Sequence, residues 1–156
     1  HRALGEVFVC LNMGFIMVSA SATLLLGRFE PCSLALALPV GLMVAGVLYY
    51  QSLPEIETDL AAGKHTLANT LGKAGAFLLF RLWWPLVWLL LCNLWAAGLA
   101  GWPVVLCLTG LPFYLAACRR IRLAGDGDWL PLDAHGPLVR KCYLISGAAL
   151  ILGVLL

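Results

Sequence analysis

The longest apolar stretch of the chain runs from Ala74 to Ala97, with the sequence AGAFLLFRLWWPLVWLLLCNLWAA. It holds one charged residue, Arg81, near its start. A helix needs about 20 mostly apolar residues to cross the hydrocarbon core of a bilayer, and this stretch is long enough. Pro85 and Asn93 do not count against a span, because membrane helices tolerate proline and use polar side chains to bond neighbouring helices. The stretch therefore predicts a transmembrane helix.

Four other stretches have the same character, and with the first they predict an all-α bundle of about five spanning helices. Their approximate bounds are 7–26, 34–53, 102–118 and 139–156. The composition agrees, since 62% of the residues are hydrophobic and 12% are charged, whereas soluble domains carry roughly 25% charged residues. A chain this apolar must have the lipid bilayer as its solvent. We expect a single membrane domain over residues 1–156.

Charge and cysteine content exclude several other classes of protein. The net charge is only +2, and no basic patch with interleaved aromatic residues occurs, so we expect no nucleic acid partner. The six cysteines form no CxxC pair and no Cys/His ligand spacing. Most lie inside apolar runs, where they act as small hydrophobic residues, and they predict neither disulfides nor a metal site.

The basic residues predict how the chain is oriented in the membrane. If the five spans alternate in direction, only Arg28 falls on one side. The other nine lysines and arginines fall on the opposite side: Arg2, Lys64, Lys73, Arg81, Arg119, Arg120, Arg122, Arg140 and Lys141. By the positive-inside rule that side is cytoplasmic, which predicts a multi-pass protein of the cell inner (cytoplasmic) membrane. We expect Arg81 to extend its side chain to the interface and the cluster at 119–122 to contact anionic lipid.

The segment from Gln51 to Leu67, QSLPEIETDLAAGKHTL, concentrates polar chemistry on the cytoplasmic side. On a continuing helix Gln51, Glu55 and Asp59 are spaced four apart and share one face, although Pro54 predicts a kink or a new first helical turn. Two carboxylates one turn apart repel each other unless a cation lies between them, and Mg²⁺ typically takes one or two carboxylates plus substrate phosphates.

Past these acids, Gly63 ends the helical pattern, and Lys64 supplies a point charge suited to a phosphate oxygen. Together with Thr66 they form a candidate cradle for Mg²⁺ and a diphosphate. The same residues also suit an ordinary solvated loop, and the spacing alone favours neither interpretation.

The segment resembles the second aspartate-rich motif of the UbiA superfamily of intramembrane prenyltransferases. That motif has the form N-x-x-x-D-x-x-x-D, then G-K-x-T-L and a short run to L-G; here it is matched by Gln51, Glu55, Asp59, 63–67 and 71–72. Two residues depart from it: Gln51 replaces the asparagine and Glu55 the first aspartate, each one methylene longer. The run from Leu4 to Val9, with Asn12, Gly14 and Phe15, is similar to the fifth helix of the menaquinone-type branch, which prenylates 1,4-dihydroxy-2-naphthoate.

The resemblance implies a function and a set of site residues. The function is Mg²⁺-dependent transfer of a prenyl group from a prenyl diphosphate to an aromatic acceptor, a quinone precursor. The resemblance implies that Glu55 and Asp59 bind Mg²⁺, that Lys64 binds the diphosphate, and that Gln51 orients its neighbours. Glu55, Asp59 and Lys64 are then the catalytic residues.

The resemblance also implies that the chain corresponds to helices five to nine of a nine-helix bundle. The chain begins at His1 and ends in an apolar run. We expect a missing N-terminal half with the first acidic motif, on the same polypeptide or on a partner, and an incomplete enzyme without it.

Three alternatives stay open at the level of the sequence. One is another UbiA branch, with a haem or chlorophyll precursor, a glycerol phosphate or 4-hydroxybenzoate as acceptor. Another is a transporter or channel with Glu55 and Asp59 as an ion relay, although such acids usually lie near the membrane midplane rather than at its edge. The last is a non-catalytic membrane protein that kept the fold.

Overall fold

The computed structural model of the protein describes residues 4–156. Arg2, one of the nine basic residues that predict the topology, lies outside the described residues. Within residues 4–156 five helices are long and apolar enough to cross a membrane, which confirms the predicted all-α transmembrane bundle. They comprise Gly5–Leu26, Cys32–Ser52, Leu67–Ala96, Trp102–Ala124 and Leu130–Leu155.

Three of the five spans are composite. The first consists of α1 (Gly5–Val9), the π-helical η1 (Cys10–Ile16) and α2 (Met17–Leu26). The second is α3 (Cys32–Ser52), the short α4 (Ile56–Ala61) follows it, and the third span is α5 (Leu67–Ala96). The fourth joins the 3₁₀-helix η2 (Trp102–Gly110) to α6 (Leu111–Ala124), and the fifth joins η3 (Leu130–His135) to α7 (Gly136–Leu155).

The helices extend beyond the apolar stretches that predicted them, mainly on the side that carries α4. The third span begins at Leu67 rather than near residue 74, and the fourth reaches Ala124 rather than residue 118. Hydropathy marks only the part of a helix that lies in hydrocarbon, whereas the helical hydrogen bonds continue into the polar region until a cap ends them. The assignment of residues 1–156 to one domain stays a prediction.

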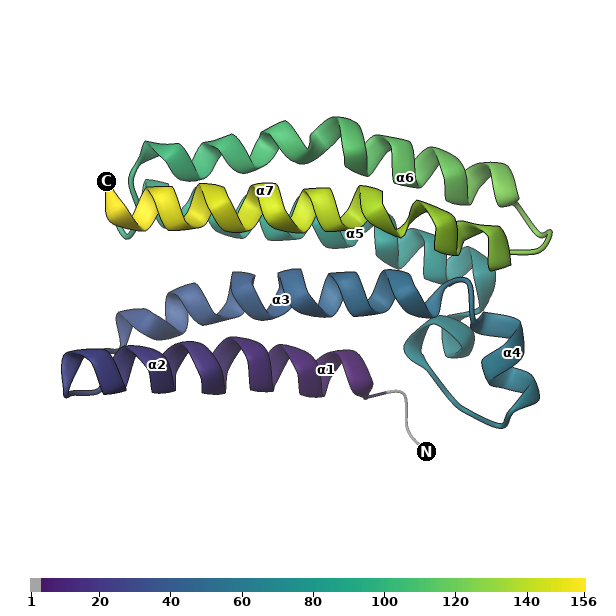
Figure 1. Cartoon of the computed structure of the whole chain (residues 1–156), viewed down its shortest axis with the longest axis horizontal. Coiled ribbons are helices and arrows are strands. Elements are labelled where there is room, and N and C mark those ends of the chain that lie inside the picture. Colours follow the sequence, from purple (N-terminus) through teal and green to yellow (C-terminus); the bar gives the residue numbers. More distant parts are fainter. Residues whose placement is uncertain (1–3) are drawn as a thin grey trace.

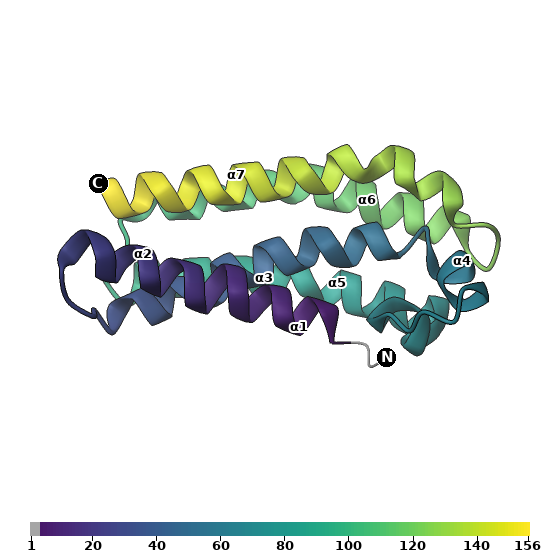
Figure 2. The ribbon, with the colours of Figure 1, turned by 60° about the horizontal axis from the view of Figure 1, so that its bottom comes forward.

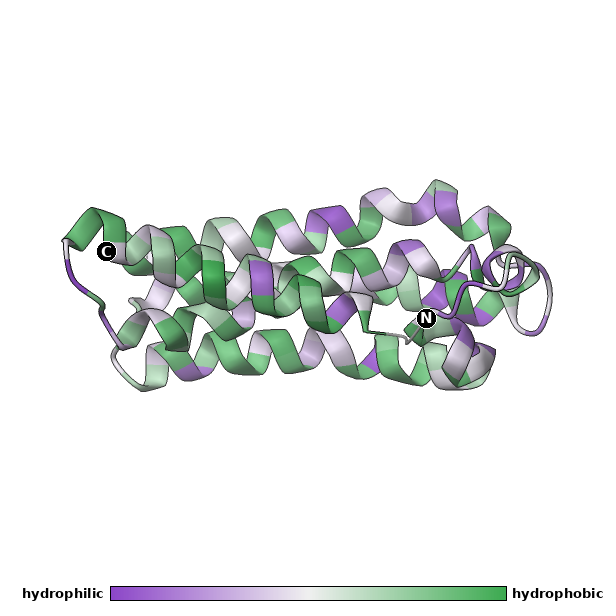
Figure 3. Ribbon diagram, turned by 90° about the horizontal axis from the view of Figure 1, so that it is seen from below, coloured by the Kyte–Doolittle hydropathy of each residue, from purple (hydrophilic) through white to green (hydrophobic). Residues whose placement is uncertain are grey.

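Helix α3 is the centre of the bundle. The first span packs against it on one side, and α5 and α7 pack against it on the other. Helix α4 and the loop between α6 and η3 lie at one end of the molecule, and the C-terminus lies at the other (Figures 1 and 2). Hydrophilic residues gather at the end that carries α4, while the spans are mostly hydrophobic (Figure 3). We call this the α4 end.

Aromatic side chains with satisfied polar tips fasten α3 to α5. The ring of Tyr49 stacks on Trp83 with centroids 5.4 Å apart. The Tyr49 hydroxyl donates to the Ala76 carbonyl at 2.9 Å, and the Trp83 indole N–H donates to the Leu42 carbonyl at 2.9 Å. Because hydrocarbon offers no partner for a polar group, these bonds let large amphipathic rings fill the interior.

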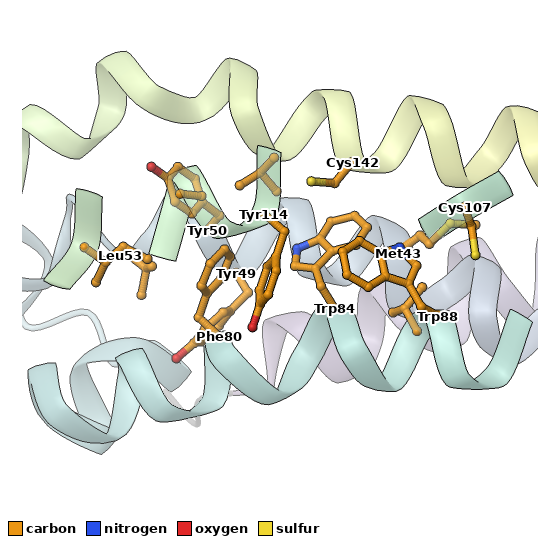
Figure 4. Packing of buried hydrophobic residues seen from close by; sticks show 14 of the residues in the cluster. Met43, Tyr49, Tyr50, Leu53, Phe80, Trp84, Trp88, Cys107, Tyr114 and Cys142 are labelled. Carbon is orange, nitrogen blue, oxygen red and sulfur yellow. The ribbon is translucent and has the colours of Figure 1, made fainter. Parts of the chain in front are cut away.

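Similar contacts attach the remaining helices to this core (Figure 4). The Tyr114 hydroxyl of α6 donates to the Arg81 carbonyl of α5 at 2.7 Å. The Tyr50 hydroxyl of α3 donates to the Leu132 carbonyl of η3 at 3.1 Å. These two hydrogen bonds therefore join four of the five spans.

Lys73 connects the three segments that form the α4 end. The backbone of α5 is interrupted at Gly72, whose φ of 65° and ψ of 169° lie outside the helical region. Directly after this kink the Lys73 ammonium donates to Glu57 of α4 at 2.6 Å. It also donates to the carbonyls of Asp126 at 3.2 Å and Gly127 at 2.7 Å. One ammonium group thus joins α4, α5 and the α6–η3 loop.

The first span approaches α3 most closely where two glycines meet. A Cβ atom added to Gly41 would lie 2.5 Å from the Cys10 carbonyl oxygen and 3.1 Å from the Gly14 Cα. Small residues at a helix crossing permit such backbone contact in membranes.

Replacement of Gly41 by alanine should lower the free energy of unfolding by about 1–3 kcal/mol, the usual cost of overpacking, because the new methyl group meets backbone atoms. The matched control is Gly147→Ala, a helical glycine whose added Cβ would meet nothing within 4 Å. The control should be as stable as the parent or slightly more so. Thermal unfolding in detergent, followed by circular dichroism, measures both, and equal midpoints for the two variants would contradict the close approach.

Lys73→Met should loosen α4 and the α6–η3 loop together, because it keeps the length of the side chain and removes all three bonds. Hydrogen exchange of residues 56–61 and 125–129 should rise by about tenfold or more, since a hydrogen bond to a charged group contributes about 1.5–3 kcal/mol. Glu57→Gln removes the ion pair but keeps both carbonyl contacts, so its effect should be smaller and confined to α4. Unchanged exchange in Lys73→Met would show that the ammonium does not hold these segments.

Candidate functional site

The predicted acidic face is divided between two helices. Helix α3 ends at Ser52, whose hydroxyl donates to the Tyr49 carbonyl at 2.8 Å. Pro54 has no N–H with which to continue the helix, and α4 begins after Glu55, its N-cap residue. No continuous helix therefore carries Gln51, Glu55 and Asp59. Pro54 predicted either a kink or a new first helical turn, and the chain adopts the new turn.

Helix α4 ends in a turn that only glycine adopts readily. Gly63 has φ +69°, in the left-handed region. Its N–H donates to the Leu60 carbonyl at 3.0 Å, and the N–H of Lys64 donates to the Asp59 carbonyl at 2.8 Å. This is the bonding pattern of a Schellman motif, in which a left-handed residue caps the last carbonyls of a helix. The turn brings Lys64 back alongside Asp59.

The side chains of these two residues also form an ion pair. Lys64 Nζ lies 3.1 Å from Asp59 Oδ1. The Asp59 side chain is 11% exposed and that of Lys64 is 59% exposed, so the lysine covers the carboxylate. The second oxygen, Asp59 Oδ2, is buried and has no hydrogen-bond partner. A buried, unpaired polar atom costs roughly 1–3 kcal/mol, and more if it is charged, so a ligand at Oδ2 would relieve an existing penalty.

Thr66 is the N-cap residue of α5, and its hydroxyl is engaged in capping that helix. Its hydroxyl accepts from the Asn69 N–H at 3.2 Å, and the Asn69 side chain accepts from the Thr66 N–H at 2.9 Å, which is a complete capping box. Asn69 also donates to the Lys64 carbonyl at 2.7 Å. The predicted cradle of glycine, lysine and threonine is therefore a rigid link in which the three residues have separate structural tasks.

A cavity of about 540 Å³ opens beside this link. Three of the four predicted site residues line it, namely Gln51, Glu55 and Lys64, whereas Asp59 lies behind Lys64 and does not. The remaining walls come from α1, the end of α3, the α4–α5 loop and η3: Gly5, Glu6, Leu48, Ser52, His65, Thr66 and Asp133. The structure thus groups the predicted residues around one space but places them in two layers.

Two carboxylates that sequence reasoning missed face the same cavity. Glu6 of α1 is 6% exposed, and Asp133 belongs to η3. The position of Glu6 immediately before an apolar run was a possible signal, because a buried acid at the edge of a span is unusual. Nothing in the sequence around Asp133 indicates its position, which depends on the packing of η3 against α3. With Glu55 they give the cavity an excess of negative charge over Lys64.

An apolar groove of about 450 Å³ continues along the bundle from the cavity. The two spaces share Leu48 and Gln51 as walls. The groove runs between the first span, α3 and α7, and its other lining residues are Val9, Met13, Val44, Val47, Arg140, Tyr143 and Leu144. Arg140 also lines a space of about 340 Å³ with Gln51 and Asp133. The polar cavity at the α4 end, which we call the mouth, therefore adjoins an apolar groove.

The donor atoms at the mouth fit a hard divalent cation better than a soft one. Glu55 supplies a carboxylate and Gln51 an amide oxygen at the cavity, and Mg²⁺ prefers oxygen ligands. No cluster of three or more His, Cys, Asp and Glu side chains that could hold a metal by itself occurs in the part of the chain that the structure describes. Mg²⁺ is bound in many enzymes by one or two carboxylates together with substrate phosphates. Glu55 offers one such carboxylate at the cavity, while Asp59 Oδ2 is buried behind Lys64 without a partner.

Comparisons with known proteins show the family to which the chain belongs. A model of the UbiA prenyltransferase family matches residues 1–130, which include the link from Gln51 to Leu67. The chain is also similar to "UbiA prenyltransferase domain-containing protein 1" of Gallus gallus, with 28% identity over 94 residues. That alignment covers 60% of this chain and 28% of the relative, so the chain spans less than a third of the relative's length. No solved structure matches. On the extent of the family match, together with the five-helix fold, the chain belongs to the UbiA prenyltransferase family.

Proposed function

We propose that this chain carries the second acidic half-site of an Mg²⁺-dependent prenyltransferase, which transfers a prenyl group from a prenyl diphosphate to an aromatic quinone precursor. The observation that carries the proposal is the pair formed by Asp59 and Lys64: Asp59 has one buried carboxylate oxygen without a partner, and Lys64 lines a cavity that adjoins an apolar groove. A charged head and an apolar tail are the two parts of a prenyl diphosphate.

The acidic residues support the proposed dependence on Mg²⁺. The mouth carries Glu6, Glu55 and Asp133 against Lys64, so it repels a diphosphate that arrives without a cation. Glu55 and Asp59 would hold Mg²⁺, with the Gln51 amide as an orienting neighbour. When bound, the ion supplies Lewis-acid stabilisation of the leaving diphosphate.

Lys64 has two roles in the proposal. Its ammonium keeps Asp59 in place at 3.1 Å, and its exposed end is available to donate to a phosphate oxygen. A positive charge held beside the leaving group stabilises the negative charge that develops as the carbon–oxygen bond breaks. The Schellman turn and the capping box fix the backbone on both sides of Lys64, so its charge is positioned before substrate arrives.

The groove supplies the environment for the other product of bond cleavage. An allylic carbocation reacts with water unless water is excluded, and walls such as Val44, Met13 and Leu144 are apolar. An electron-rich aromatic carbon of the acceptor then attacks the cation. The similarity of residues 4–9 to the menaquinone-type branch favours a 1,4-dihydroxy-2-naphthoate-like acceptor among the quinone precursors.

The proposal includes two further parts. One is a first acidic motif supplied from outside residues 1–156, as the family resemblance implies, either on the same polypeptide or on a partner. The other is a cytoplasmic orientation of the α4 end in the inner membrane. It is supported by the positive-inside rule, since Lys64 lines the mouth at this end and Lys73 and Arg122 line another cavity there.

Asp59→Asn in the complete enzyme should abolish Mg²⁺-dependent transfer of a labelled prenyl group, because it removes the only charge at the buried oxygen while keeping the shape of the side chain. Glu57→Gln is the matched control, since Glu57 lies two residues away but pairs with Lys73 outside the cavity. It should retain most of the activity. Transfer that survives Asp59→Asn would refute the ligand assignment.

Val44→Trp should fill the groove and leave the mouth intact. We expect the affinity for geranylgeranyl diphosphate to fall by about tenfold or more, because each excluded methylene group loses about 0.8 kcal/mol of burial. The affinity for inorganic diphosphate with Mg²⁺ should stay within about twofold on the same reasoning. Val154→Trp, at an exposed position of α7, controls for the added bulk. Equal losses for both ligands would place the tail elsewhere. Both affinities are measured by equilibrium binding in detergent.

A further inference from the structure

A separate cavity lies between α5 and α6. It has a volume of about 470 Å³ and shares no lining residue with the mouth or the apolar groove of the proposed active site. Three of its walls are arginines, Arg81 from α5 with Arg119 and Arg122 from α6. The others are Phe77, Leu115, Cys118 and Leu123. We call it the arginine groove.

The packing of the two helices fixes how the arginines converge. The Tyr114 hydroxyl donates to the Arg81 carbonyl at 2.7 Å, which fastens α6 to α5 at that level. Arg119 and Arg122 are three apart in the next turns of α6, so they share one face. The Arg81 guanidinium lies 5.8 Å from the centroid of Phe77, one turn nearer the α4 end. All three charges therefore point to the same boundary of the membrane.

The depth of Arg81 agrees with this direction. At about 1.5 Å per residue, Arg81 lies roughly 22 Å from Ala96 at the far end of α5. The hydrocarbon core is about 30 Å thick, so the backbone of Arg81 lies inside it, within reach of the interface for a long side chain. The head of the side chain belongs at the level of lipid headgroups.

These charges have no acidic partners. Among residues 4–156 no carboxylate lies within salt-bridge distance of Arg81, Arg119 or Arg122. Asp126 lines a neighbouring cavity with Arg122 but is not paired with it. Clustered like charges repel each other, and the cost is offset when an anion binds between them. Guanidinium groups bind phosphate oxygens in a bidentate fashion.

We propose that the arginine groove binds the phosphate headgroup of an anionic phospholipid of the membrane. The guanidinium groups hold the phosphate, while Leu115 and Leu123, which are 54% and 69% exposed, contact its glycerol and acyl chains. A lipid rather than a free anion is favoured because apolar and cationic walls lie in one groove, between two helices that are long and apolar enough to cross a membrane. This site does not depend on the proposed prenyl transfer.

The experiment compares lipid binding by the purified chain and two triple variants, using native mass spectrometry from detergent. The probes are phosphatidylglycerol and phosphatidylcholine with identical acyl chains. The test variant is Arg81→Gln/Arg119→Gln/Arg122→Gln. The control variant, Arg28→Gln/Arg120→Gln/Lys141→Gln, makes the same change in net charge at positions that do not line the groove. Thermal unfolding in detergent establishes that both variants are folded, as expected for exposed arginines.

The parent chain should retain phosphatidylglycerol in preference to phosphatidylcholine. The test variant should lose this preference by about tenfold or more, while the control should stay within about twofold, since each basic residue near an anionic headgroup contributes substantially. The corresponding triple Arg→Lys variant should be intermediate, because it keeps the charge and loses bidentate contact.

Three outcomes would overturn the proposal. One is an equal affinity of the parent chain for the two lipids. Another is an equal loss in the control variant, which would indicate only general surface charge. The last is displacement of the lipid by millimolar inorganic phosphate or diphosphate, which would assign the groove to a free anion.

Discussion

The turn at Gly63 is the constraint on which the α4 end depends. Its left-handed backbone ends α4, returns Lys64 to Asp59 through a backbone and a side-chain contact, and delivers the chain to Thr66 as the cap of α5. A residue with a Cβ would pay roughly 1–2 kcal/mol for that conformation. The residues that resemble the family motif in this segment therefore form one tight link between α4 and α5.

The link also explains how a highly apolar chain can keep a charged site. Buried ions are stable only when they are paired and hydrogen-bonded, and here Lys64 covers Asp59 while Lys73 joins α4 to the α6–η3 loop. The spans beneath are held by aromatic rings; the polar tips of Tyr49, Trp83 and Tyr114 are hydrogen-bonded. The buried indole N–H of Trp84 has no partner in the part of the chain that the structure describes. Most of the charge thus lies at the α4 end, while Arg28 and Glu30 pair at the opposite end, and the buried core between them is mostly apolar.

Much of the fold could be predicted from hydropathy, because the length of an apolar run is a direct measure of a membrane span. The ends of the helices could not be predicted in this way, because they depend on caps. The capping box of Thr66 and Asn69 lets α5 begin at Leu67, whereas hydropathy predicted a start near residue 74. Hydropathy also does not predict the 3₁₀ geometry of η2 or the kink at Gly72, because it records only the polarity of each residue.

The candidate site was predictable to the extent that it is local in sequence. Gln51, Glu55 and Lys64 lie within one segment, and they line one cavity. The contributions of Glu6, Asp133 and Arg140 come from two other spans, the first and the fifth, and only the packing of those spans around α3 brings them to the cavity and the spaces beside it. Asp59 lies behind Lys64 because the helix breaks at Pro54. The spacing of the acids did not decide whether Pro54 would kink the helix or end it.

The central claim is that the acids at this link and a diphosphate bind one divalent cation together. Electron paramagnetic resonance of Mn²⁺ titrated into the chain in nanodiscs, with and without inorganic diphosphate, tests it directly. The account predicts that diphosphate tightens Mn²⁺ binding by about tenfold or more, as expected when phosphate oxygens complete a carboxylate site, and that bound Mn²⁺ shows coupling to phosphorus. Mn²⁺ binding that is unchanged by diphosphate, or that shows no phosphorus coupling, would contradict it.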